Sequence, residues 1–362
     1  MKILIAPDKF KGSLNAREVA ENIARGLREV LTDAKIDVVP MADGGEGTAD
    51  VICDALGGSW VTCKAHDPLG REIDCRYACI ESRKLAVMEM SEAAGMRRLQ
   101  SNEKDVDRAT TFGLGEMILD ASGRDAREII IGLGGSATND GGFGVARAIG
   151  FRFLKQEQDK DIRGRVSELA KLTRIERPRD LSLPKIIAAA DVRNPLFGKN
   201  GATRIFGPQK GATGDTIDIL ERALTKLAEV VSKDLGVDYQ GEPGTGAAGG
   251  LGFGLMSFCG AKIRPGFDVV AEAVDLETKM KDVDLVITGE GSLDSQTLEG
   301  KTPAGVARLA RQLGKGVFAI VGRASGSPEA RELFDGVYEL GGGIPQAREL
   351  LRRKALELAK SL

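Results

Sequence analysis

Residues 1–8 are Met1-Lys2-Ile3-Leu4-Ile5-Ala6-Pro7-Asp8, a short apolar run that Pro and Asp bring to an end. Apolar, β-rich runs of this length predict a buried strand. After a Gly/Ser loop, apolar residues recur at helical spacing, and Asn15 with Glu18 is close to a capping box. A second strand-like run covers 36–40 and a second helical run covers 48–56. This order predicts the start of a doubly wound parallel sheet.

The same alternation of strand-like and helical runs returns from residue 284 to the end of the chain. Three further strand-like runs there bring the candidates for one parallel sheet to five. In the middle, consecutive strand-like runs at 60–65, 72–80 and 84–89 have no helix between them, which predicts an antiparallel meander. We therefore predict an α/β fold with two domains. The first is formed by residues 1–59 and 281–362, and the second, with a mixed sheet, is inserted at 60–280.

The composition argues against several classes of protein. Lys and Arg number 51 against 53 Asp and Glu, and aromatic residues make up only 4%. A chain with balanced charge and few aromatic residues is a poor candidate for binding nucleic acid or an anionic membrane. No apolar run reaches the length of a membrane span. We expect small molecules as partners, and a monomer or homodimer.

The five cysteines do not form a Cys-x-x-Cys pair, and their odd number argues against a disulfide framework. A reduced, cytoplasmic protein is therefore expected. The single histidine, His66, precedes the turn-like Asp67-Pro68-Leu69-Gly70, so neither a zinc site nor catalysis by imidazole is favoured.

Loops rich in Gly, several with acidic and basic residues, follow the predicted strands. Ligands of such sheets bind outside the carboxyl ends of the strands, so we expect the loops to converge on one cleft. Phosphoryl transfer requires positioning, metal-binding carboxylates and cationic clamps, and this set of residues suits it. The loops cover residues 6–13, 42–48, 131–142, 190–211 and 288–303.

Three motifs leave alternatives open. Gly132-x-Gly134-x-x-Ala137 matches a degenerate dinucleotide fingerprint, but no clear acidic residue follows at the expected strand end. Residues 244–249 satisfy G-x-G-x-x-G without a preceding strand, and Gly300-Lys301-Thr302 is not a Walker A loop, although Thr302 is expected to cap a helix. An NAD(P)-dependent oxidoreductase of a small hydroxy acid and a non-catalytic sugar-acid binding protein remain alternatives.

Together the motifs resemble the glycerate kinase family, which includes the bacterial glycerate 2-kinases. The resemblance implies two α/β domains, one of them flavodoxin-like (Rossmann-like). It also implies phosphorylation of D-glycerate with ATP and Mg²⁺, with 2-phosphoglycerate favoured and 3-phosphoglycerate as the other product of the family. Lys9 stands where some members carry Ser, and Leu114 where Thr is common. The resembling stretches are residues 5–14, 42–48, 131–142, 191–196, 201–212, 246–250 and 287–301.

The residues and the resemblance together lead to a set of expected roles. Asp294 is the first choice for the base that accepts the hydroxyl proton and Asp191 the second, with Lys9 as a further catalytic residue. ATP is expected to contact Gly134, Gly135, Ser136, Gly246, Gly249 and Lys301. Mg²⁺ is expected at Asp191 and Asp43. Glycerate is expected to contact Asp8, Lys11, Ser13, Asp43, Glu46, Arg193 and Glu290.

Overall fold

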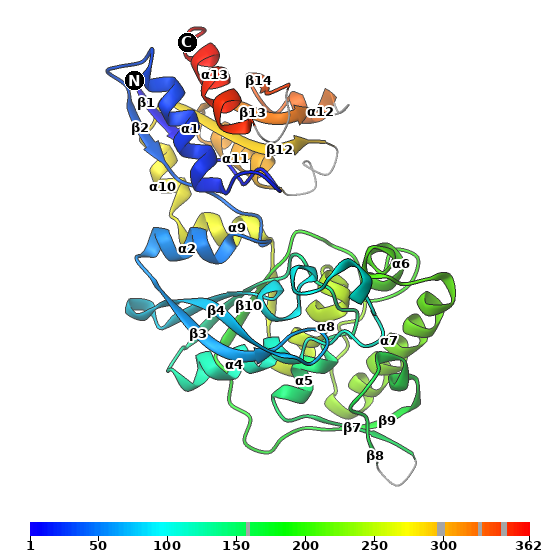
Figure 1. The fold of residues 1–362 in the computed structure, drawn as a ribbon. Helices are drawn as coiled ribbons and strands as arrows, with labels where there is room; N and C mark the ends of the chain where they lie inside the picture. The colour runs from blue at the N-terminus through cyan, green and yellow to red at the C-terminus, as the bar shows by residue number, and fades with distance from the viewer. Residues whose placement is uncertain (157–159, 295–300, 325–327, 342–345) are drawn as a thin grey trace. The chain divides into compact units, whose positions relative to one another are not determined.

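The computed structural model describes residues 1–156, 160–294, 301–324, 328–341 and 346–362. The chain forms two compact units (Figure 1): unit 1 is Met1–Gly57 with Pro265–Leu362, and unit 2 is Gly58–Arg264. Residues 265–280, which the sequence analysis assigns to the inserted domain, lie in unit 1. There α9 (Gly266–Ala273) packs against α2 (Thr48–Leu56).

Unit 1 is built on a five-stranded parallel sheet with the order β14-β13-β12-β1-β2. This confirms the predicted α/β fold with a parallel sheet made by both ends of the chain. The buried residues Ile3, Leu4 and Ile5 pair with the central strand β12. The strands are β1 (Lys2–Ile5), β2 (Lys35–Val38), β12 (Leu285–Leu293), β13 (Gly316–Ala324) and β14 (Gly336–Glu339).

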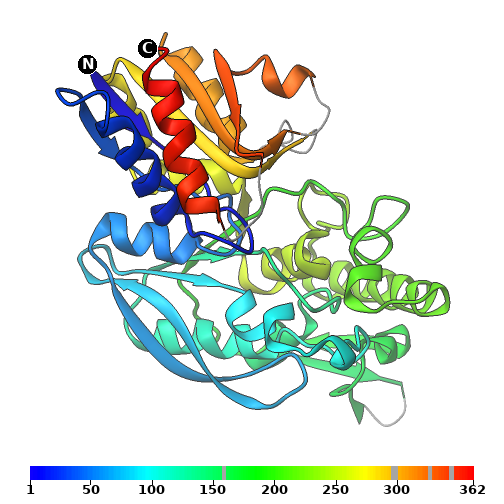
Figure 2. The same cartoon turned by 45° about the horizontal axis from the view of Figure 1, so that its top comes forward.

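Helices α1 (Ala16–Arg28) and α13 (Ala347–Ala359) pack side by side, as both ribbon views show (Figures 1 and 2). A side chain at Gly26 would place its Cβ 2.2 Å from the Arg352 carbonyl oxygen, so glycine allows this close approach. The predicted capping box of Asn15 and Glu18 is confirmed. The other helices of unit 1 are α10 (Leu276–Lys281), α11 (Thr302–Gln312) and α12 (Pro328–Arg331).

Unit 2 contains a six-stranded mixed sheet with the order β11-β10-β6-β5-β4-β3. Strands β3, β4 and β5 are antiparallel neighbours, which confirms the predicted meander, whereas β5, β6, β10 and β11 pair in parallel. The strands are β3 (Ser59–His66), β4 (Glu72–Ile80), β5 (Leu85–Glu89), β6 (Glu128–Gly132), β10 (Lys185–Ala189) and β11 (Lys262–Arg264).

A second core of unit 2 lies around the long helix α7 (Gly214–Leu235) and a three-stranded sheet that the sequence analysis did not predict. Edge-to-face contacts between Phe143 and Phe153 contribute to this core. The sheet is formed by β7 (Arg152–Lys155), β8 (Lys160–Asp161) and β9 (Leu172–Glu176). The other helices are α3 (Ser91–Ala94), α4 (Phe112–Gly123), α5 (Phe143–Ala148), α6 (Ala202–Phe206), α8 (Ala247–Cys259), and the 3₁₀ helices η1 (Glu81–Arg83), η2 (Met96–Arg98), η3 (Ser101–Glu103), η4 (Val166–Lys171) and η5 (Pro208–Lys210).

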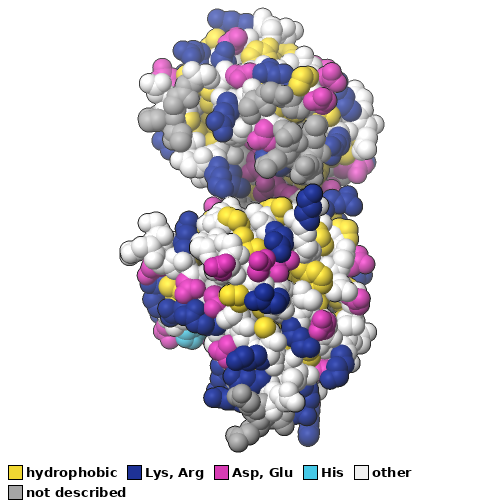
Figure 3. Space-filling model, turned by 90° about the vertical axis from the view of Figure 1, so that its right-hand side faces the viewer, with side chains coloured by type: hydrophobic (Ala, Val, Ile, Leu, Met, Phe, Trp, Pro, Cys, Tyr) yellow, Lys and Arg dark blue, Asp and Glu magenta, His cyan; other side chains and the backbone are white. Residues whose placement is uncertain are grey.

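The surface matches the balanced composition. On the face shown in Figure 3, Lys and Arg side chains are interspersed with Asp and Glu. In the described part of the chain, no helix is both long and apolar enough to cross a bilayer. All five cysteines are free thiols.

Candidate functional site

In unit 1, the loop that follows β1 lies beside the loop that follows β2. Asp8 is only 6% exposed. It accepts a hydrogen bond of 2.7 Å from Thr302 Oγ1 and lies 3.7 Å from Lys9 Nζ. Lys9 Nζ in turn lies 3.9 Å from Asp43 Oδ1. Three residues predicted from the sequence, Asp8, Lys9 and Asp43, are thus brought together at the carboxyl edge of the sheet.

Burial raises the pKa of Asp8 to about 6, with the negative charge of Asp43 acting in the same direction. The Lys9 ammonium and the hydrogen bond from Thr302 oppose this rise in the pKa. A carboxyl group with a pKa near neutrality can exchange a proton at physiological pH. Asp8 is therefore a candidate for proton transfer.

Asp8→Asn is expected to remove part of the pH dependence of the free energy of unfolding. The folded state keeps a proton on Asp8 that the unfolded chain releases between the ordinary pKa of 3.8 and about 6. The free energy of unfolding of the unchanged protein therefore falls as the pH rises through this window. The contribution of Asp8 is about 3 kcal/mol. Urea unfolding of both proteins across this window measures it, and parallel pH profiles would contradict the assignment.

The loop that carries Asp43 is held in place by its own backbone and by α9. Gly45 N donates to Asp43 Oδ1 at 3.0 Å, and Thr48 Oγ1 donates to the Gly45 carbonyl at 2.7 Å. A Cβ at Gly266 would lie 2.0 Å from the Asp43 carbonyl oxygen, so the start of α9 supports this loop directly. The predicted residue Glu46 lies in the same loop and is half-buried.

The remaining predicted residues of unit 1 have different surroundings. Lys11 is exposed, whereas Ser13 Oγ donates to the Phe10 carbonyl at 3.0 Å and is used in a turn. Glu290 is buried on β12. Asp294 lies at the end of the described part of this segment, and its Oδ1 is 3.4 Å from Lys301 Nζ. Residues 295–300, which include Gly300 of the predicted motif, lie outside the described residues.

The prediction that Thr302 caps α11 is wrong. Lys301 occupies the cap position, and Thr302 is the first residue of the helix. The Thr302 hydroxyl donates instead to Asp8, which lies 294 positions away in the sequence. Lys301, which pairs with Asp294, directly precedes Thr302, which donates to Asp8. The two interactions are therefore made by neighbouring residues of the chain.

In unit 2, the glycine-rich loop after β6 is joined to two other predicted segments. Gly141 N donates to the Gly249 carbonyl at 3.0 Å, which ties the loop to the start of α8. Gly246 N donates to the Asn194 carbonyl at 2.8 Å, which ties α8 to the loop that carries Asp191 and Arg193. Asp191 is half-buried and Arg193 is exposed.

The start of α8 contains a left-handed turn at Ala248, Gly249 and Gly250, whose φ angles are 54°, 71° and 85°. A left-handed conformation is uncommon for a residue with a Cβ such as Ala248, and backbone strain of this kind often accompanies functional sites. Gly246 and Gly249 are both buried against neighbouring backbone. Gly246 and Gly249 therefore pack against the adjacent loops and help to fix their backbone conformation.

The first part of the glycine-rich loop is accessible to a ligand. Gly135 is exposed and has a φ of 75°, and Gly134 is half-buried. Ser136 is buried, and its Oγ accepts a hydrogen bond from Lys210 Nζ at 2.6 Å. Glycines at this position allow an anion to approach the backbone N–H groups closely.

Two buried ionisable residues of this loop region were not chosen in the sequence analysis. Asp140 accepts hydrogen bonds from Thr111 N and Oγ1 and from the backbone N–H groups of Gly142 and Gly144. Burial raises the pKa of Asp140, whereas these hydrogen bonds oppose the rise. Lys210 is 2% exposed. Its position in Gly207-Pro208-Gln209-Lys210-Gly211, inside one of the glycine-rich segments, was the available signal.

No group of three or more His, Cys, Asp or Glu side chains within the described ranges is arranged to hold a metal ion. Mg²⁺ in nucleotide-dependent enzymes usually takes only one or two protein carboxylates, the other ligands being waters and phosphates. The carboxylate oxygens of Asp191 and Asp43 have the chemistry that such a site requires.

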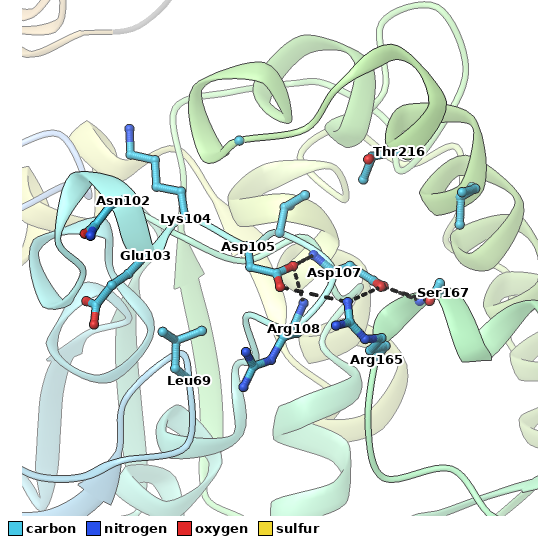
Figure 4. Close-up of a pocket in the computed structure, with 13 residues that line it drawn as sticks. Leu69, Asn102, Glu103, Lys104, Asp105, Asp107, Arg108, Arg165, Ser167 and Thr216 are labelled. Atoms are coloured by element: carbon cyan, nitrogen blue, oxygen red, sulfur yellow. Dashed lines mark hydrogen bonds and ion pairs between the residues drawn. The ribbon is translucent and has the colours of Figure 1, made fainter.

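Unit 2 also has a surface pocket of about 600 Å³ (Figure 4). Several of its charged side chains pair with one another: Arg165 lies 3.9 Å from Asp105 and 3.1 Å from Asp107. None of the site residues predicted from the sequence lines this pocket.

Comparisons with known proteins find relatives over the whole chain. A model of the glycerate kinase family matches residues 3–362. A glycerate kinase of Bacillus subtilis is 40% identical over 100% of this chain and 98% of its own length. A glycerate 2-kinase of Escherichia coli is 44% identical over 89% of this chain and 85% of its own length. A solved structure from Salmonella typhimurium LT2, assigned as glycerate kinase 2, has a TM-score of 0.88 and 40% identity, covering 100% and 98% of the two chains.

Proposed function

Since this chain belongs to the glycerate kinase family, we propose that it transfers the terminal phosphoryl group of ATP to D-glycerate. The match over residues 3–362 is the observation that carries this proposal, and it makes the chain a phosphotransferase. The relative named glycerate 2-kinase supports 2-phosphoglycerate as the product. The free cysteines are in keeping with a reducing, cytoplasmic setting. The enzyme acts as a monomer or homodimer on small molecules alone.

The accessible loop at Gly134 and Gly135 binds the phosphates of ATP in this proposal. Its backbone N–H groups supply fixed donors to the anionic oxygens, as glycine-rich loops do in many nucleotide enzymes. The hydrogen bond of Ser136 with Lys210 and the packing of the left-handed turn of α8 hold the conformation of this loop. Mg²⁺, which neutralises charge on the phosphates when bound, would be held by Asp191, and Asp43 is the other candidate carboxylate.

Glycerate is bound by the charged residues of the sheet edge. Lys9, Lys11 or Arg193 holds the substrate carboxylate or the transferring phosphoryl group. Asp8 and the Asp43 loop fix the position of Lys9 through the contacts described above. Ser13, Glu46 and Glu290 complete the proposed contacts with the substrate.

A carboxylate accepts the proton of the attacking hydroxyl group. We assign this role to Asp294, with Asp191 as the second candidate. As the hydroxyl oxygen bonds to phosphorus, its proton passes to the carboxylate and ADP leaves. Lys301 Nζ lies 3.4 Å from Asp294 Oδ1 and can meet a phosphate oxygen.

Phosphorus NMR of the protein with ATP, Mg²⁺ and D-glycerate tests this function. We expect ADP and the signal of 2-phosphoglycerate, whose position on the substrate the coupling pattern identifies. A signal of 3-phosphoglycerate would overturn the regiochemistry alone. Absence of any phosphoglycerate would overturn the proposed function. Binding of NADH in the same preparation would then favour an oxidoreductase, and binding of D-glycerate without turnover a sugar-acid binding protein.

A further inference from the structure

Lys210 lies at the end of η5, in direct contact with the glycine-rich loop of unit 2. Its Nζ donates to Ser136 Oγ at 2.6 Å and to the Thr138 carbonyl at 2.7 Å. At 2% exposure it is one of the most buried charged side chains that the structure describes. Lysine is almost never fully buried unless it is paired, so such a position requires a physical reason.

The loop above Lys210 is not fully satisfied in its own hydrogen bonds. Among the described residues, no partner reaches Thr138 Oγ1 or Asn139 Oδ1, although both atoms are buried. Unsatisfied buried polar atoms cost free energy, and they are rare in folded proteins. These two unsatisfied atoms and the strained turn at Ala248, which packs against the loop, both cost stability. Costs of this kind are typical of functional sites.

We propose that Lys210 is a positioning residue for nucleotide binding: its ammonium group holds Ser136 and Thr138 in place and puts a positive charge beneath the phosphates of ATP. This inference rests on the proposed function. Hydrogen bonds from an ammonium group are about twice as strong as neutral ones, and they are stronger still in a buried site. Lys210 thereby fixes the part of the loop that directly follows the exposed Gly135.

The charge of Lys210 depends on what the loop binds. Burial lowers the pKa of Lys210 to about 7, and the carboxylate of Asp140 opposes this change. The elements packed against η5 carry the charged groups Asp140, Lys104 and Arg204, and Arg204 is paired with Asp218. An anion on the loop stabilises the ammonium form and raises the pKa of Lys210. Binding of ATP is then accompanied by uptake of a proton, and affinity falls as the pH rises above 7.

Lys210→Met keeps most of the length of the side chain and removes its charge and donors. We expect KM for ATP to rise and kcat/KM for ATP to fall by roughly tenfold to a hundredfold, with KM for D-glycerate unchanged. The pH dependence of the ATP affinity above pH 7 should disappear in this variant. Lys233→Met, which removes an exposed lysine of α7 in the same unit, is the matched control and should behave as the unchanged enzyme.

Titration calorimetry of the unchanged enzyme with ATP provides a test that does not depend on the folding of a variant. At pH 8 the phosphates of ATP are almost fully ionised, so they take up few protons themselves. Measured in two buffers with different ionisation enthalpies, binding should show net uptake of a proton. ATP binding without proton uptake, or an unchanged KM for ATP in Lys210→Met, would overturn the inference about Lys210. If the unchanged enzyme still phosphorylates D-glycerate, the proposed function stands in that case. An unchanged enzyme that neither binds nor consumes ATP would overturn both.

Discussion

Asp294→Asn is expected to lower kcat for glycerate phosphorylation by roughly 10²–10⁴-fold, the usual contribution of a general base. The amide keeps the size of the side chain but cannot accept the hydroxyl proton. Because the loss is confined to the chemical step, KM for ATP should change much less than kcat. Initial rates with varied ATP and varied D-glycerate measure both parameters.

The control for this experiment is Asp282→Asn, which removes an exposed carboxylate from the same unit. It should leave kcat unchanged. A normal kcat in Asp294→Asn would exclude Asp294 as the base, and Asp191→Asn then becomes the decisive variant. If Asp191→Asn also retains a normal kcat, Asp8, with its pKa of about 6, is the next carboxyl group to test.

The parallel sheet of unit 1 could be predicted because its signal is local. Each strand is a short apolar run, and a loop and a helical run follow in regular alternation. The pairing of β1 with β12 joins residues about 280 positions apart, yet it follows from the rule that such alternating units build one sheet. The antiparallel strands β3–β5 were also predictable from a local signal, since no α-helix separates them.

The interior of the site could not be predicted in the same way. Whether Lys210 is buried depends on how η5 packs under a loop about 70 residues earlier in the chain, and composition alone favours an exposed lysine. The contact between Thr302 and Asp8 replaces the local role of helix cap by a tertiary one. The sequence identified the loops that we propose to carry the chemistry, whereas the partners of their side chains depend on tertiary packing.

The glycines of α8 show the same limit. The literal G-x-G-x-x-G of residues 244–249 was discounted because no strand precedes it, and the structure indeed places a loop and a helix start there. The glycines are explained by the left-handed turn, which lies against the backbone of Thr138 and Asn139, and by the close approach of Gly246 to the backbone of the loop at 194–195. Neither a positive φ nor a backbone contact leaves a periodic pattern in the sequence.

Gly249→Ala is therefore expected to be among the most damaging single substitutions in unit 2. The added Cβ would lie 2.0 Å from the Thr138 carbonyl oxygen and 2.6 Å from the Asn139 Cα, and φ is 71°. The positive φ costs about 1–2 kcal/mol and the clash with backbone about 1–3 kcal/mol more. Because Thr138 also accepts from Lys210, displacing it should weaken ATP binding as well.

Thermal unfolding and ATP affinity of Gly249→Ala test both consequences. A loss of about 3 kcal/mol lowers the unfolding midpoint of a unit of this size by roughly 6–12 °C. Gly241→Ala is the matched control, because its Cβ would meet nothing within 4 Å and its φ is not positive. A stable Gly249→Ala protein with normal ATP affinity would show that the turn adjusts freely, and the glycine-rich loop would then not depend on α8 for its shape.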